Sequence, residues 1–221
     1  MELVLCDYGT YASPQNDMIG GIRGACNFFS YNFSSGTYFL TGEVDCGAWS
    51  FVYSLLDASN PSTQYKMINL DGKPVNLSEI EKLTFHVGQY EMYGNKPFSD
   101  ILRQALRETK TKYTFDDICE IFGVDEARRD REFSALSSQK WRFTIALGLA
   151  MNKKIFVFPW LSKTWFRSTD FFSLLRILNK ENVLSLVPCS EKIQIPQEEK
   201  FTVVRMNSLF EIDFDTLPDG E

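Results

Sequence analysis

Apolar residues follow two different spacings along this chain. Short runs of β-branched and aromatic residues, such as 37–41 and 155–158, have the length and composition of buried strands. Other segments repeat apolar residues at helical spacing, as Trp141, Ile145 and Leu149 do. We predict strands at 37–41, 65–70, 83–87, 155–158 and 183–187, helices at 49–56 and 169–178, and an edge strand from Lys200 onward.

The order of these elements predicts an α/β fold, because strands that alternate with helices form a largely parallel sheet. The strand 37–41 ends at Gly42 and is followed by the helix 49–56, which gives a strand, a glycine turn and a helix. Gln89 follows the strand 83–87 directly.

Between Phe98 and Phe133 the sequence changes to charged, amphipathic helix. Thr114 and Asp117 have the spacing of a capping pair at the start of a helix. Ser137 is positioned to cap the long helix that precedes the strand 155–158. We read this part of the chain as a helical insertion.

Length and composition set limits on the domain organisation. The 221 residues suffice for one domain with an inserted subdomain: an α/β core at about 1–89 and 140–221, and a helical subdomain at about 90–139. The net charge of −6 gives no basic footprint for nucleic acid, so nucleic acid is not expected as a partner.

Five scattered cysteines without a C-x-x-C pair suggest neither a disulfide framework nor a zinc site. The start of the chain lacks the pattern of a secretory signal, and no apolar run is long enough to span a bilayer. We expect a cytoplasmic protein, and any work at a membrane would need another subunit that crosses it.

The stretch 136–158, beginning Leu136-Ser137-Ser138-Gln139, resembles the part of ATP-binding-cassette (ABC) ATPases that runs from the LSGGQ signature to the Walker B strand. The segment from Gly42 to Ser50 lies where that family has its phosphate-binding loop, and Gln89 lies where it has the Q-loop glutamine. The resemblance implies a P-loop NTPase (ABC ATPase-like) core with an inserted helical subdomain and an antiparallel β edge.

The segment that resembles the phosphate-binding loop lacks most of the residues that bind phosphate and Mg²⁺ in that family. Gly42 and Gly47 remain, but Asp45 replaces the third glycine, Ala48 the lysine, and Trp49 the hydroxyl residue that holds Mg²⁺. An acidic group would face a polyphosphate without its compensating cation. Taken alone, the segment also reads as an ordinary glycine turn between a strand and a helix.

The hydrolytic residues are replaced as well. Pro159 and Trp160 follow the predicted Walker B strand, where the family carries an aspartate and a glutamate. The family's switch histidine would follow the last core strand, but that position has Pro188 and Cys189. The one histidine, His86, reads as a surface or satisfied strand residue. We expect a pseudo-ATPase with no catalytic residue, metal ligand or cofactor of its own.

In dimers of the family, the signature of one subunit closes over ATP held by the other. The resemblance therefore implies that Ser137, Ser138 and Gln139 face a partner's ATP and Mg²⁺, and that Gly42, Gly47 and Gln89 are vestiges of a nucleotide site. Ser137 could equally be a helix cap worth about 1 kcal/mol, and the two roles are compatible.

Three functions remain open from the sequence. The first is a non-catalytic nucleotide-binding-domain subunit of an ABC transporter, which pairs with an active ABC ATPase and docks to a transmembrane permease. The second is a regulatory or scaffolding protein that reuses the fold as a homodimer. The third is an enzyme that binds nucleotide by an unfamiliar route. Co-purified partners separate the first two, and turnover by the pure chain would favour the third.

Overall fold

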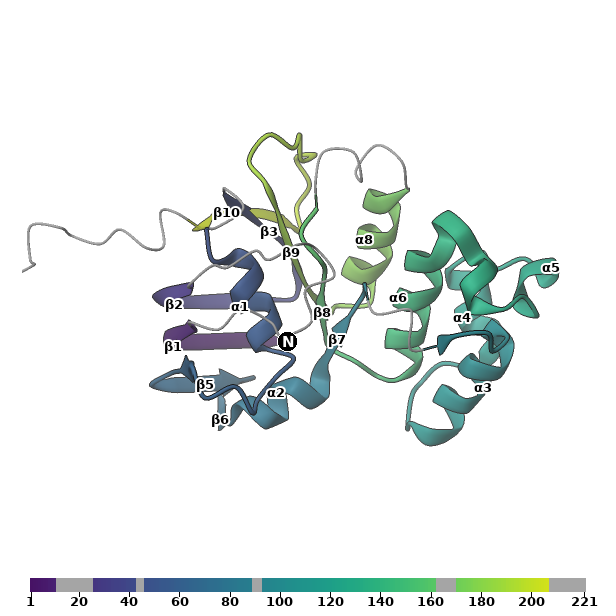
Figure 1. Ribbon diagram of the computed structural model, residues 1–221, viewed down its shortest axis with the longest axis horizontal. Helices are drawn as coiled ribbons and strands as arrows, with labels where there is room; N and C mark the ends of the chain where they lie inside the picture. The colour runs from purple at the N-terminus through teal and green to yellow at the C-terminus, as the bar shows by residue number, and fades with distance from the viewer. Residues whose placement is uncertain (11–25, 43–45, 89–92, 162–169, 207–221) are drawn as a thin grey trace, which may run out of the picture.

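The computed structural model describes residues 1–10, 26–42, 46–88, 93–161 and 170–206. Two five-stranded sheets, one antiparallel and one parallel, lie next to each other (Figure 1). Most of the helices lie on the side of the parallel sheet that faces away from the antiparallel sheet. The strands are β1 Glu2–Thr10, β2 Cys26–Ser34, β3 Gly36–Gly42, β4 Thr63–Gln64, β5 Met67–Leu70, β6 Lys73–Val75, β7 Thr84–His86, β8 Ile155–Val157, β9 Leu184–Ser190 and β10 Phe201–Arg205. The helices are α1 Ala48–Ser54, α2 Leu77–Leu83, α3 Phe98–Glu108, α4 Phe115–Ile121, α5 Glu126–Arg129, the 3₁₀ helix η2 Phe133–Gln139, α6 Lys140–Ala150 and α8 Phe171–Lys180.

One sheet is parallel throughout, with the strand order β10-β3-β9-β8-β7. Its strands are short and buried: all residues of β3, β7 and β8 are inaccessible or nearly so. Strands buried on both faces read as continuous apolar runs, which is why the sequence located most of them. The predicted α/β class is confirmed, and β10 is the predicted edge strand.

The second sheet is antiparallel, with the order β2-β1-β5-β6 and β4 paired to β1. Leu3, Leu5 and Phe33 point inward from β1 and β2, whereas Glu2 and Asn32 lie on the exposed face. The sequence prediction assigned neither β1 nor β2. This sheet supplies the antiparallel β component of the expected fold.

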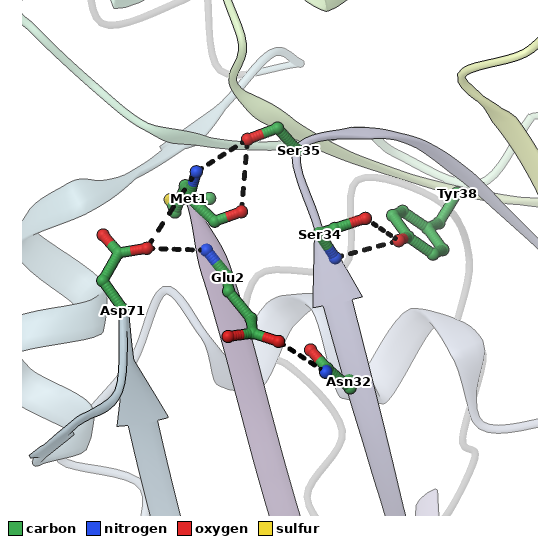
Figure 2. A network of polar contacts seen from close by, with 7 residues as sticks. All are labelled: Met1, Glu2, Asn32, Ser34, Ser35, Tyr38 and Asp71. Atoms are coloured by element: carbon green, nitrogen blue, oxygen red, sulfur yellow. Dashed lines mark hydrogen bonds and ion pairs between the residues drawn. The ribbon is translucent and has the colours of Figure 1, made fainter.

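A network of polar contacts joins the two sheets where β2 turns into β3 (Figure 2). The amino group of Met1 donates to Ser35 Oγ at 2.9 Å, and Asp71 Oδ1 accepts from the backbone N–H of Glu2 at 2.8 Å. Tyr38, at the start of β3, accepts from the last backbone N–H of β2 at 2.9 Å. The N-terminal strand is therefore fixed both to the β5–β6 hairpin and to the parallel sheet.

The parallel sheet separates two hydrophobic clusters, because alternate residues of each strand face opposite sides. Phe39, Phe156 and Val187 belong to the cluster under the helical region, α6 and α8. Leu40 and Val157 belong to the cluster shared with the antiparallel sheet and α1. The chain is thus layered as antiparallel sheet and α1, parallel sheet, and helices.

The helical insertion consists of α3, α4 and α5, and its predicted capping pair is confirmed. The Thr114 side chain accepts from the Asp117 N–H at 3.1 Å, and the Asp117 carboxylate accepts from the Thr114 N–H at 2.7 Å. Phe115 lies under two guanidinium groups, 4.7 Å from that of Arg103 and 5.7 Å from that of Arg129. These contacts hold α4 against α3 and α5.

Gly148 in α6 marks the closest approach of a helix to the parallel sheet. A Cβ atom there would lie 2.5 Å from Phe156 Cε1 and 2.8 Å from Phe85 Cδ1. Glycine to alanine normally favours a helix by about 1 kcal/mol, but overpacking a core costs about 1–3 kcal/mol. We expect Gly148→Ala to lower the free energy of unfolding in urea by about 1 kcal/mol or more.

A second substitution identifies the cause of that loss. Adding Phe156→Leu shortens the ring that the new methyl group meets, so it should recover part of the stability in a double-mutant cycle. Equal effects of Gly148→Ala in both backgrounds would mean that the close approach to Phe156 is not what requires glycine.

Candidate functional site

The carboxyl ends of the parallel strands meet at one edge of the sheet, where open α/β sheets bind their ligands. The last residues of the strands at this edge are Gly42 of β3, His86 of β7, Val157 of β8, Ser190 of β9 and Arg205 of β10. Gly42 pairs with Ser190, so the loop after β3 starts beside the end of β9. This edge is the candidate site.

The glycine turn predicted at this edge has the expected geometry. After β3, Gly47 adopts a left-handed conformation with φ 82° and is the N-cap of α1, without a side-chain cap bond. A positive φ of this kind is readily adopted only by glycine. Ala48 begins α1 and is fully buried, and Asp45 lies outside the described residues. The structure therefore places both predicted glycines, Gly42 and Gly47, around one strand-to-helix loop.

An aromatic cluster links α1 to the end of β7. Trp49 and Tyr53 are one helical turn apart, with ring centroids separated by 4.3 Å. The Tyr53 hydroxyl lies 3.3 Å from His86 Nε2, and their rings are 5.1 Å apart. Trp49 is 5% exposed, and no hydrogen-bond partner for its Nε1 is found among the described residues. We call Trp49, Tyr53 and His86 the aromatic cluster.

His86 is buried rather than exposed, because all three residues of β7 are covered. It is 7% exposed, and burial lowers its pKa to about 4. An imidazole with that pKa is neutral at pH 7 and supplies no positive charge for a phosphate. The sequence analysis did not predict that His86 is buried against an aromatic cluster. The spacing of Trp49 and Tyr53, which puts both on one face of a helix, was the signal that could have indicated such a cluster.

The segment after β8 is apolar. Phe158 is fully buried, and Pro159 and Trp160 are half-buried. A Cβ atom on Gly88 would lie 3.1 Å from His86 Cε1 and 3.3 Å from Pro159 Cγ, so the chain after β7 passes close to this segment. The aromatic cluster and the end of β8 are thus packed against the same glycine.

Two buried thiols complete this edge. Burial raises the pKa of Cys189 to about 12, and the neighbouring Cys46 contributes to the same shift. A thiol with that pKa stays protonated and is a poor nucleophile and metal ligand. Within the described ranges, His, Cys, Asp and Glu side chains form no group of three that could hold a metal ion.

The signature-like segment has a different local structure from the one predicted. The backbone of Ser137 and Ser138 lies inside η2, and the N-cap of α6 is Gln139, which makes no side-chain cap bond. The prediction that Ser137 caps this helix is wrong. Helix α6 continues directly from a 3₁₀ turn. The carbonyl groups of such a turn can accept hydrogen bonds from the first N–H groups of the helix, which a capping side chain would otherwise accept. Gln89 lies outside the described residues.

The chain is similar in structure to ATP-binding proteins of ABC transporters. A putative ABC transporter ATP-binding protein from Pyrococcus furiosus superimposes with a TM-score of 0.63 at 13% identity, over 95% of this chain and 99% of that one. The chain has the ABC ATPase fold. CbiO1 from Clostridium perfringens, part of the ABC transporter complex cbiONQ, superimposes with a TM-score of 0.59 at 14% identity, over 86% and 78% of the two chains.

A bacterial Atm1-family ABC exporter with ATP bound shares the fold with a TM-score of 0.55 at 12% identity, over 86% of this chain and 34% of the exporter. No protein-family model and no curated protein matches the sequence. The ABC ATPase fold is therefore shown by the comparison of structures, and it agrees with the resemblance that the stretch 136–158 carries. Among the helices the structure describes, none combines the length and apolar character needed to cross a bilayer.

Proposed function

We propose that this chain is a non-catalytic nucleotide-binding-domain subunit of an ABC transporter, which pairs with an active ABC ATPase and docks to a membrane subunit. The observation that carries the proposal is the apolar character of the start of α1 and of the segment after β8. Ala48 and Trp49 start α1, Phe158 and Pro159 follow β8, and His86 is buried with its pKa lowered. The first turn of α1 contains no charged residue.

Electrostatics explain why these apolar residues fit a structural role better than a catalytic one. Phosphoryl transfer needs cations and a metal placed where negative charge develops. At the positions that would carry them, this chain has a methyl group, an indole and a proline. Catalytic power would then belong to the partner, and ATP and Mg²⁺ would be held only in the partner's site.

The contribution to a partner would come from the start of α6. Ser137, Ser138 and Gln139 form the turn that leads into this helix, and in an ABC dimer that turn faces the opposite subunit's nucleotide. CbiO1 belongs to a complex with other chains, which favours a subunit that acts with partners over one that acts alone. The chain would lie on the cytoplasmic side of the membrane through its permease partner.

Calorimetric titration with Mg-ATP tests the proposal. The isolated chain is expected to show no saturable heat at millimolar Mg-ATP, and the complex purified with its partner ATPase is expected to bind with a stoichiometry set by the partner's own sites. Tight binding with turnover by the isolated chain would contradict the proposal.

A second candidate is a homodimeric regulatory or scaffolding protein that reuses the fold. Its distinguishing result is a stable homodimer in solution, recovered from cells without a second ABC ATPase or a membrane protein. Recovery with both would favour the transporter subunit.

A further inference from the structure

The loop between α3 and α4 reaches across to the end of α8. The Tyr113 hydroxyl donates a hydrogen bond to Glu181 Oε2, and Lys112 Nζ donates to the same oxygen at 2.9 Å. Lys112 Nζ also lies 4.8 Å from the centroid of the Tyr113 ring. The neighbouring residues Lys112 and Tyr113 thus form one group with Glu181, which lies almost seventy positions further along the chain.

Glu181 occupies an unfavourable place for a carboxylate. It is the C-cap of α8, where the helix dipole disfavours negative charge, and its side chain is only 17% exposed. Burial by itself would raise the pKa of Glu181, but the hydrogen bonds from Tyr113 and Lys112 outweigh burial and leave the pKa below its usual value. The carboxylate therefore depends on these two donors.

The two ends of the contact belong to different parts of the fold. Tyr113 directly precedes Thr114, the N-cap of α4. Glu181 lies between α8 and β9, a central strand of the parallel sheet. A second contact ties the helical insertion to α6, since Arg142 Nη1 donates to the carbonyl of Phe122, the C-cap of α4, at 2.9 Å.

We propose that Lys112, Tyr113 and Glu181 form a latch that sets the orientation of the helical insertion, α3 to α5, against α8 and the parallel sheet without any nucleotide. The proposal rests on the proposed function in one respect: a subunit retained for its shape needs a relative orientation that no bound ATP maintains. The latch provides it from residues of the chain itself. The Lys112 side chain is 72% exposed, so the half-buried Tyr113 supplies the better protected of the two charge-assisted hydrogen bonds to Glu181.

Hydrogen exchange measured by mass spectrometry on the full chain tests the latch. Tyr113→Phe keeps the ring and removes the donor, and Glu181→Gln keeps the shape and removes the charge. In both variants we expect amides in residues 109–121 to exchange about tenfold faster, because each loses a hydrogen bond to a charged group. Exchange in β3 and β9 should stay at the wild-type rate.

Glu198→Gln is the matched control. It also removes a carboxylate from an ion pair, that with Arg176 of α8 at 2.7 Å, but neither partner of this pair belongs to the helical insertion. The control should leave exchange in 109–121 unchanged. The latch is overturned if both latch variants exchange there like wild type, or if exchange accelerates uniformly through the parallel sheet. Neither ATP nor a partner enters this measurement, so its failure is distinct from a failure of the Mg-ATP titration.

Discussion

Replacing Trp49 with alanine is expected to lower the free energy of unfolding by about 3–5 kcal/mol, the range for a buried aromatic side chain. Trp49 is 5% exposed and stacks against Tyr53, which in turn contacts His86. Its removal leaves a space at the start of α1 that the neighbouring rings can fill only in part. For a domain of this size the melting temperature should fall by roughly 10 °C.

Trp160→Ala is the matched control for that substitution, because it removes the same side chain from a half-buried position. Its loss should be smaller, roughly 1–2 kcal/mol, in proportion to the smaller area it buries. Urea unfolding of both variants by circular dichroism gives the comparison. A loss below that of Trp160→Ala would show that the Trp49 indole is not a packed part of the fold.

The same variant also bears on nucleotide binding. On the proposed correspondence with ABC ATPases, Trp49→Ala would empty the position of the metal-binding hydroxyl, but it would supply neither that hydroxyl nor the lysine whose place Ala48 takes. Mg-ATP affinity should therefore stay undetectable in a folded Trp49→Ala chain. Space alone does not make a phosphate site, because polyphosphate binding depends on cations and aligned N–H groups.

Part of this fold could be predicted from local sequence. Strand β3 and helix α1 were found because Gly42 separates a β-rich run from a helical one, and the Thr114 and Asp117 capping box follows from side-chain reach alone. Strands β8 and β9 were found because they are buried on both faces. Each of these signals lies within a few residues of the element it defines.

Features that depend on distant residues were missed. The burial of His86 arises from α1 and the segment around Pro159, which approach β7 only in the folded chain. Strand β1 pairs with β2 and with β5, across long stretches of sequence. Ser137 was assigned as a cap because its residue type fits, whereas the 3₁₀ turn that replaces a cap depends on how η2 packs beside α6.

His86 makes the stability of the protein depend on pH in a defined window. Burial lowers its pKa to about 4 in the folded chain, against an ordinary value of 6.5. A depressed pKa stabilises the fold above pH 6.5, and this stabilisation is lost as the pH falls from 6.5 towards 4, because the unfolded chain takes up the proton first. The full loss is about 3 kcal/mol, since each pKa unit corresponds to about 1.4 kcal/mol.

The measurement separates His86 from the carboxylates, which titrate mainly below pH 5. Between pH 6.5 and 5 the wild-type free energy of unfolding in urea should fall by roughly 1–2 kcal/mol, and that of His86→Gln should stay nearly constant. Because the chain contains one histidine, its imidazole resonance can be followed by NMR without assignment. A titration midpoint near 6.5 in the folded protein would mean that the imidazole is hydrated. It would also mean that the aromatic cluster does not bury His86 at the edge of the parallel sheet.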